Sequence, residues 1–133
     1  MSYRTYITVL LIKNKGFFTI TMSEDPYELL KSMTEKAMPK LASKVGGPVK
    51  VFQFTGEGYE PFYIEVGGGS IKLNKGTHRS PTATIQVNRE NLLKLITGQL
   101  DAMQAYFSGI IKVTGNIMDA ATLIDIMNTA RTA

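Results

Sequence analysis

The sequence lacks cysteine altogether and has a single histidine, His78, among its 133 residues. The missing thiols exclude disulfides, thiolate metal ligands and a cysteine nucleophile. One imidazole excludes a zinc site built from several histidines. We therefore expect no metal and no cofactor, and many classes of metalloprotein and hydrolase are excluded before any motif is considered.

Long hydrophobic runs are also missing, because no stretch reaches the roughly 18 consecutive apolar residues that a membrane-spanning helix needs. The best N-terminal run, from Ile7 to Ile12, is interrupted by Thr8 and ends at Lys13. It is also too short for a secretory signal. We expect a soluble, cytoplasmic protein.

Charge is moderate: 15 Lys and Arg residues against 11 Asp and Glu residues give a net charge of +4. Few arginines and no stacking aromatics accompany the lysines, so nucleic acid is not an expected partner. Hydrophobic residues make up 44% of the chain, enough for one core. We predict a single domain over residues 1–133, with an N-terminal extension (1–23) and a core (24–133).

The N-terminal extension is predicted to be a β-hairpin. Residues 3–12 and 17–22 are rich in Tyr, Ile, Val, Phe and Thr, and residues 13–16 between them favour a turn. An isolated hairpin is marginally stable in water. It should therefore pack on the rest of the domain or on a second subunit, which makes a homodimer a candidate assembly.

A helix should begin at Asp25 and Pro26, a strong N-cap signal, and Pro39 should kink it or end its first part near Met38. Strands and helices then alternate with glycine-rich turns. The predicted strands are 49–54, 62–66, 71–73, 83–87 and 110–114, and the predicted helices are 88–98, 101–108 and 117–130 with Asn116 as the last cap.

The last predicted helix is apolar over more of its circumference than packing on one surface requires. At about 100° per residue its apolar side chains span roughly 220°, whereas a stripe of a little over 100° is typical. A neighbouring helix, a partner subunit or a bound lipid could cover the excess. The residues that form this arc are Ile117, Ala120, Ala121, Leu123, Ile124, Ile126, Met127 and Ala130.

Catalytic motifs are not found in the sequence. Gly67 to Ser70 and Lys75 to Thr77 lack the spacing of a phosphate-binding loop. Ser70 and Ser108 lack the Gly-x-Ser-x-Gly pattern of a nucleophile elbow. His78 lies in a polar loop with no evident partner. We predict that the protein is not an enzyme, and a small hydrolase acting on acyl chains is disfavoured because no nucleophile and base are paired.

Two patterns have both a structural and a functional interpretation. Lys36, Lys40 and Lys44 recur at intervals of four, so they form either a solvated helix face or a strip that contacts an anionic membrane surface. Met103, Met118 and Met127 lie in the apolar C-terminal third. Methionine is an adaptable contact, and these residues either fill the core or line a cavity for apolar ligands.

From Ser80 onward the order of elements becomes family-specific. Ser80–Val87 is a threonine-containing strand, Asn91–Asp101 is a helix that ends in Thr-Gly, and Phe107–Asn116 reads Phe-x-Gly-x-x-Lys-Val-x-Gly-Asn. With Phe62–Val66 upstream, these segments resemble the type-2 sterol carrier protein domain over roughly residues 24–133.

This resemblance implies an α/β (α+β) fold: a mostly antiparallel five-stranded sheet covered on one face by helices, here with an extra N-terminal β-hairpin. It also implies a hydrophobic tunnel for a sterol, fatty acid or fatty acyl-CoA, closed by the last helix. The family often has Gln at the positions of Met103 and Ser108, so a drier tunnel is implied at Met103.

The predicted function is non-enzymatic binding and transfer of an apolar lipid, such as a fatty acid, a fatty acyl-CoA or a sterol or isoprenoid. The alternative is a structural or dimerisation module with the same fold and a filled cavity. The predicted lipid-binding residues come from the middle strand and the C-terminal third: Phe52, Phe54, Leu95, Ile96, Met103, Phe107, Ile110, Met118, Leu123, Ile126 and Met127.

Overall fold

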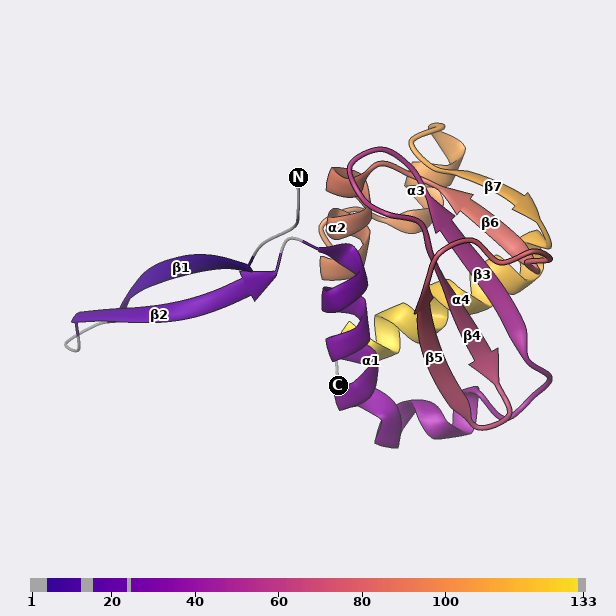
Figure 1. The fold of residues 1–133 in the computed structure, drawn as a ribbon, viewed down its shortest axis with the longest axis horizontal. Coiled ribbons are helices and arrows are strands. Elements are labelled where there is room, and N and C mark those ends of the chain that lie inside the picture. Colours follow the sequence, from indigo (N-terminus) through magenta and orange to yellow (C-terminus); the bar gives the residue numbers. More distant parts are fainter. Residues whose placement is uncertain (1–4, 13–15, 24, 132–133) are drawn as a thin grey trace.

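In the computed structural model, which describes residues 5–12, 16–23 and 25–131, a five-stranded sheet carries helices on one face (Figure 1). A separate two-stranded sheet precedes it. The elements are β1 (Thr5–Ile12), β2 (Gly16–Ser23), α1 (Pro26–Leu41), η1 (Ala42–Lys44), β3 (Lys50–Thr55), β4 (Phe62–Gly67), β5 (Ser70–Lys75), β6 (Ala83–Gln86), α2 (Arg89–Thr97), α3 (Ala102–Phe107), β7 (Lys112–Gly115) and α4 (Ile117–Arg131).

The large sheet has the strand order β5-β4-β3-β6-β7. Its neighbouring strands are antiparallel except for β3 and β6, which pair in parallel. The expectation of a mostly antiparallel five-stranded sheet under helices is confirmed, with this one parallel pair as a difference. The sheet is mixed because the chain leaves β5 at one edge and returns on the far side of β3.

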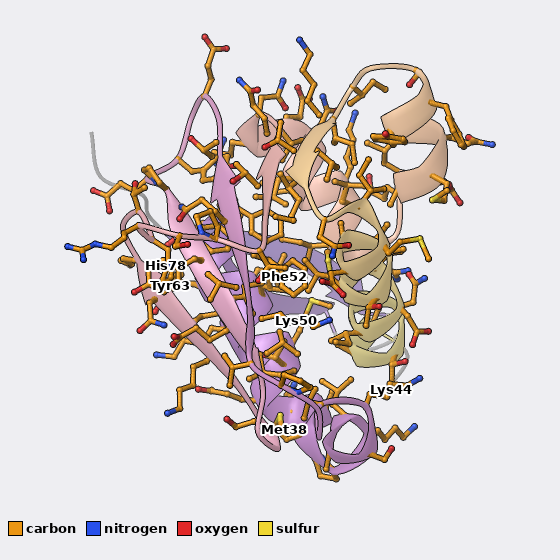
Figure 2. All side chains as sticks on the ribbon, turned by 90° about the vertical axis from the view of Figure 1, so that its right-hand side faces the viewer. Met38, Lys44, Lys50, Phe52, Tyr63 and His78 are labelled. Carbon is orange, nitrogen blue, oxygen red and sulfur yellow. The ribbon has the colours of Figure 1, made fainter. Side chains whose placement is uncertain are left out.

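The crossing segment between β5 and β6 passes over the face of the sheet that the helices leave open. Buried Gln53 projects from β3 on that face, where its Nε2 donates to the carbonyl oxygen of Gly76 at 3.0 Å and its Oε1 accepts from the His78 N–H at 2.7 Å. Figure 2 shows His78 beside Tyr63, with ring centroids 5.0 Å apart. One buried amide thus holds the crossing segment against the central strand.

Helix α1 begins as its sequence predicts. Asp25 is the N-cap, and its side chain accepts from the Tyr27 N–H at 3.2 Å. Burial raises the pKa of the Asp25 carboxyl above its usual value of 3.8, although this hydrogen bond opposes the shift. The helix does not end near Met38, since it continues through Pro39 to Leu41, and a kink at Pro39 stays a prediction. Leu41 is fully buried, and this burial holds the last turn in place despite the missing N–H of proline.

The predicted N-terminal hairpin forms as two antiparallel strands, with Ile12 opposite Gly16 and Thr5 opposite Ser23. The turn residues Lys13 to Lys15 lie outside the described residues. Figure 1 draws the hairpin projecting beyond the start of α1, and its two strands pair with each other rather than with the large sheet. Its packing partner stays a prediction.

The remaining predicted elements agree with the structure to within about two residues at each end, the usual uncertainty of helix and strand boundaries. Asn116 caps α4 as expected, since its Oδ1 accepts from the Asp119 N–H at 3.0 Å. Within the described ranges, no helix combines the length and apolarity needed to cross a bilayer.

Gly56, after β3, lies against the backbone of Val87, after β6, so closely that a side chain at position 56 would collide with it. A Cβ at Gly56 would lie 1.7 Å from the carbonyl oxygen of Val87. We expect Gly56→Ala to lower the free energy of unfolding by about 2 kcal/mol or more, measured by urea denaturation. Gly46→Ala is the control because a Cβ at Gly46 would meet nothing within 4 Å, and it should change stability by less than about 0.5 kcal/mol. Equal effects of the two substitutions would contradict this packing.

Candidate functional site

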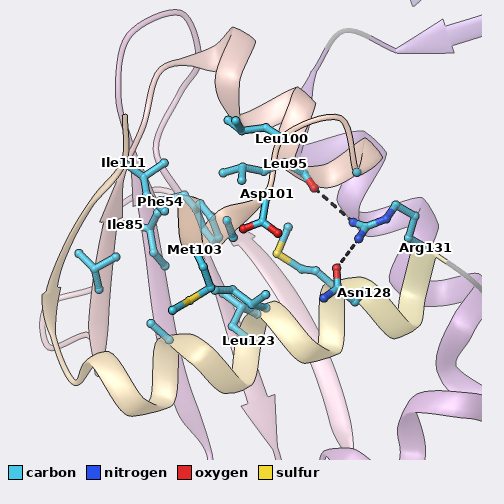
Figure 3. A pocket seen from close by; sticks show the side chains of 16 residues that line it. Phe54, Ile85, Leu95, Leu100, Asp101, Met103, Ile111, Leu123, Asn128 and Arg131 are labelled. Carbon is cyan, nitrogen blue, oxygen red and sulfur yellow. Dashed lines mark hydrogen bonds between the residues drawn. The ribbon is translucent and has the colours of Figure 1, made fainter. Parts of the chain in front are cut away.

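A pocket of about 270 Å³ lies between α4, α3 and the helix-covered face of the sheet (Figure 3). Its wall is apolar for most of its extent and becomes polar near the end of α4. The apolar residues are Phe54, Ile85, Leu95, Leu100, Ala102, Met103, Ile111, Val113, Ala120, Leu123, Ile124 and Met127; the others are Gly98, Asp101, Asn128 and Arg131.

The sheet contributes a row of side chains across three neighbouring strands. Phe54 of β3 is in register with Ile85 of β6, and Ile85 is in register with Val113 of β7. Residues directly opposite one another on paired strands project from the same face. The three side chains therefore form a continuous apolar floor, and Ile111 extends it because it lies two residues before Val113.

Helix α4 forms the opposite wall. Ala120, Leu123 and Met127 follow helical spacing and face the sheet, and all three are buried. The start of α4 is tied to β3 by an ion pair between Lys50 Nζ and Asp119 Oδ1 at 2.5 Å. The helix is thus held beside the sheet at one end while its middle borders the pocket.

The polar end of the pocket is built around Arg131. Its Nη1 donates to the carbonyl oxygens of Leu95 at 3.3 Å and Ile96 at 3.4 Å, and its Nη2 donates to Asn128 Oδ1 (Figure 3). Gly98, with φ +84°, leaves the space for the guanidinium, since a Cβ there would lie 2.6 Å from Arg131 Nε. Arg131 therefore joins α4 to the C-terminal end of α2.

The chemistry available in the pocket is limited. Among the described residues that line it there is no Ser, Thr, Cys or His. The carboxylate of Asp101 is exposed and accepts from the Gln104 N–H at 2.9 Å as the N-cap of α3. The arrangement suits the enclosure of an apolar molecule and contains no paired nucleophile and base.

Five of the residues predicted to bind lipid lie in this wall: Phe54, Leu95, Met103, Leu123 and Met127. Three others are buried outside it: Phe52, Ile96 and Ile126. Phe52 shares a strand face with Phe54 but lies two residues nearer the start of β3. Phe52 is buried but is not among the residues that line the pocket. Sequence alternation therefore identified the right face of the strand but could not locate the pocket along it.

The other three predicted residues are exposed and are not part of the wall. Phe107 is 76% exposed, Met118 is 79% exposed and Ile110 is 41% exposed. Helix α3 ends at Phe107 and the following turn directs this side chain outward. Met118 is in the first turn of α4, on the side away from the sheet.

Several wall residues escaped the sequence-based prediction. Alternation in β6 and before β7 would have indicated Ile85, Ile111 and Val113 as residues of one sheet face. Ala120 belongs to the apolar arc that the sequence indicates for α4. No local signal indicates Arg131, because its contacts come from the distant end of α2.

The predicted lysine strip is partly neutralised in the structure. Lys44 Nζ lies 2.9 Å from Asp125 Oδ2 of α4 (Lys44 is labelled in Figure 2). Lys36 and Lys40 are exposed on α1. The strip therefore presents two lysines to solvent, together with a third that fastens η1 to α4.

The chain matches the family model described as the SCP-2 sterol transfer family over residues 27–128. It belongs to that family. Among curated proteins, this SCP-2 family member is 34% identical over 64 residues to the peroxisomal multifunctional enzyme A of Dictyostelium discoideum; the match covers 48% of the chain and 14% of that enzyme.

Two solved structures show the same fold. The palmitated SCP2L2 of Aedes aegypti superposes with a TM-score of 0.61 at 20% identity, over 75% of this chain and 92% of that one. The sterol carrier protein domain 2 of Helicoverpa armigera gives a TM-score of 0.59 at 26% identity, over 80% and 86%. The fold of the SCP-2 family is thus confirmed for this chain.

The bridge between α4 and α2 leads to a stability prediction. Arg131→Ala removes the two hydrogen bonds that the guanidinium donates to α2, together with the one to Asn128, so we expect a loss of about 1.5 kcal/mol in the free energy of unfolding. Amide exchange near Gly98 should also become faster, measured by NMR. Arg79→Ala, in an exposed loop, is the control and should leave both measurements unchanged. Equal behaviour of the two variants would show that the bridge contributes nothing.

Proposed function

We propose that this protein binds an apolar lipid non-covalently in the pocket and transfers it between membranes or proteins. The observation that carries the proposal is the void of about 270 Å³ between α4 and the apolar floor of Phe54, Ile85 and Val113. A mainly apolar pocket with a few polar groups at one end is the usual form of a site for an apolar ligand. The candidate ligands are a fatty acid, a fatty acyl-CoA and a sterol or isoprenoid.

The size of the pocket favours a slim ligand among these. Ligand pockets usually measure about 300–1,000 Å³, and this one lies just below that range at about 270 Å³. A single extended chain fits such a space better than a broad ring system. The palmitated relative from Aedes aegypti supports the choice of a fatty acid as the first ligand to test.

The energetics of a single chain suit a carrier. Burial contributes about 0.8 kcal/mol for each methylene, or roughly 11 kcal/mol for a 16-carbon chain, and association costs at least about 4 kcal/mol. The difference corresponds to a dissociation constant in the micromolar range. Such a ligand is held and also released, and no catalytic group is required.

A second candidate function rests on the N-terminal hairpin. Strands β1 and β2 pair only with each other within the described residues, and a lone hairpin is marginally stable. A second copy of the chain could complete the sheet, which would make the protein a dimer. The lysines Lys36 and Lys40 are proposed as an electrostatic contact with an anionic membrane in either case.

The dimer hypothesis is tested by sedimentation. Leu10 and Leu11 are adjacent residues of β1, so substituting each in turn tests both positions of the two-residue repeat of a strand. We expect the unmodified chain to sediment as a dimer, and either Leu10→Lys or Leu11→Lys to convert it to a monomer by placing a charge in the interface. A monomeric unmodified chain would rule the dimer out.

Lipid binding is tested by filling the pocket. Ala120 lines the pocket and is buried, whereas its neighbour Ala121 is exposed on the same helix and is not in the wall. We expect Ala120→Leu to weaken palmitate binding at least about tenfold, because added methyl groups occupy the ligand volume. Ala121→Leu should leave the affinity unchanged. Titration calorimetry gives the affinity, and native mass spectrometry shows whether lipid co-purifies.

The outcome for a purely structural module is different. If the cavity is filled or inert, the unmodified chain and both variants should show no palmitate binding at the pocket, and the purified protein should carry no lipid. Circular dichroism and thermal unfolding of both variants establish that they are folded. Loss of binding in the Ala121→Leu variant alone would also contradict the proposed site.

A further inference from the structure

Exposed apolar side chains gather on α3 and the turn that follows it. Met103 is 48% exposed, Phe107 is 76% exposed and Ile110 is 41% exposed. Met103 and Phe107 are four residues apart and lie on one face of the helix. These three residues, called the α3 patch below, form half of the large exposed hydrophobic residues in the part of the chain whose side chains are described.

The α3 patch is held firmly in this exposed position. The N–H groups of Ile110 and Ile111 both donate to the carbonyl oxygen of Ala105, at 2.9 and 3.2 Å. Ala105 is fully buried and Ile111 is 5% exposed in the pocket wall. The two ends of the turn are thus anchored in the core, and the side chains between them are presented to the outside by the backbone.

The patch is continuous with the pocket, because Met103 belongs to both. Whatever covers the patch therefore also meets the edge of the pocket. Residues 102–118 contain one charged residue, Lys112, and no acidic residue. The segment is bordered by Asp101, whose carboxylate is exposed, and by Asp119, which is paired with Lys50. Docking of the patch on a phosphate-bearing lipid surface would place Lys112 near the headgroups and requires that the Asp101 carboxylate stay in water.

We propose that the α3 patch docks on a phospholipid bilayer, with Phe107 inserted among the acyl chains and the Met103 edge of the pocket facing the lipid. A bilayer fits better than a second copy of the chain, because a permanent partner would seal the edge of the pocket. The proposal rests on the proposed lipid carriage, for which it provides the surface where lipid enters and leaves.

The first experiment measures binding to phosphatidylcholine vesicles with and without phosphatidylserine. Phe107→Ser should lower the vesicle partition coefficient about tenfold, as expected for removal of one inserted aromatic side chain. Val49→Ser is the matched control: Val49 is also a large exposed residue, at 59%, but precedes β3 and lies outside the patch. It should leave partitioning unchanged.

A second measurement does not depend on loss of binding. The chain has no tryptophan, so Phe107→Trp introduces a single fluorophore at the patch. Its emission should shift to the blue on vesicles and be quenched by lipids brominated in the acyl chains, and this should persist at high salt. A Lys36→Gln, Lys40→Gln variant should lose only salt-sensitive binding. Emission that does not respond to vesicles would overturn the proposal.

Failure of the docking surface is distinguishable from failure of lipid binding. Phe107 is not in the pocket wall, so Phe107→Ser should bind palmitate in vesicle-free solution with unchanged affinity while transferring it from vesicles more slowly. Unchanged vesicle binding by Phe107→Ser overturns the docking surface alone. A dimer that Phe107→Ser dissociates, seen by sedimentation, would show that a second copy covers the patch and would also overturn it.

Discussion

The incomplete burial of the apolar surface of α4 is the constraint on which the pocket depends. The buried side chains of this helix cover about 120° at about 100° per residue, the width of an ordinary packing stripe. Ile124 and its neighbours continue the apolar surface beyond that stripe, over the pocket and out to the exposed Ile117. The buried residues are Ala120, Leu123, Ile126, Met127 and Ala130. Because the apolar surface of α4 extends beyond its packing stripe, a mainly apolar space is left between the helix and the sheet.

The sheet provides the complementary surface through its one parallel pair. Because β3 and β6 run in parallel, Phe54 meets Ile85, and β7 then adds Val113 to the same row. The segment that leads from β5 to β6 crosses the opposite face of the sheet, where Gln53 holds it in place. This crossing puts β6 parallel to β3. Charged contacts, such as that of Lys50 with Asp119, sit at the margins, where they position α4 without entering the apolar volume.

Local sequence signals predicted the elements well because each depends on neighbouring residues. The Asp25 and Asn116 caps, the Gly98 helix end and the strand alternation are all short-range effects. The continuation of α1 past Met38 has a long-range cause: burial of Leu41 against the core outweighed the local helix-breaking tendency of Pro39. The same limitation affected the site. Periodicity selects a face of an element, but the distance from that face to its neighbour depends on how the elements are packed.

The order of the elements and the surplus of apolar surface in the last helix follow from the sequence itself, since spacing and composition encode them, and the resemblance to the sterol carrier family adds the fold. Only the tertiary structure decided which of these apolar residues line the pocket, which are buried in the core and which are exposed. It placed Phe54 and Met127 in the pocket wall, buried Phe52 outside that wall, left Phe107 exposed and brought Arg131 to the end of α2. The reason is physical: a cavity is the space that packed elements fail to fill, and it depends on contacts between residues far apart in the chain.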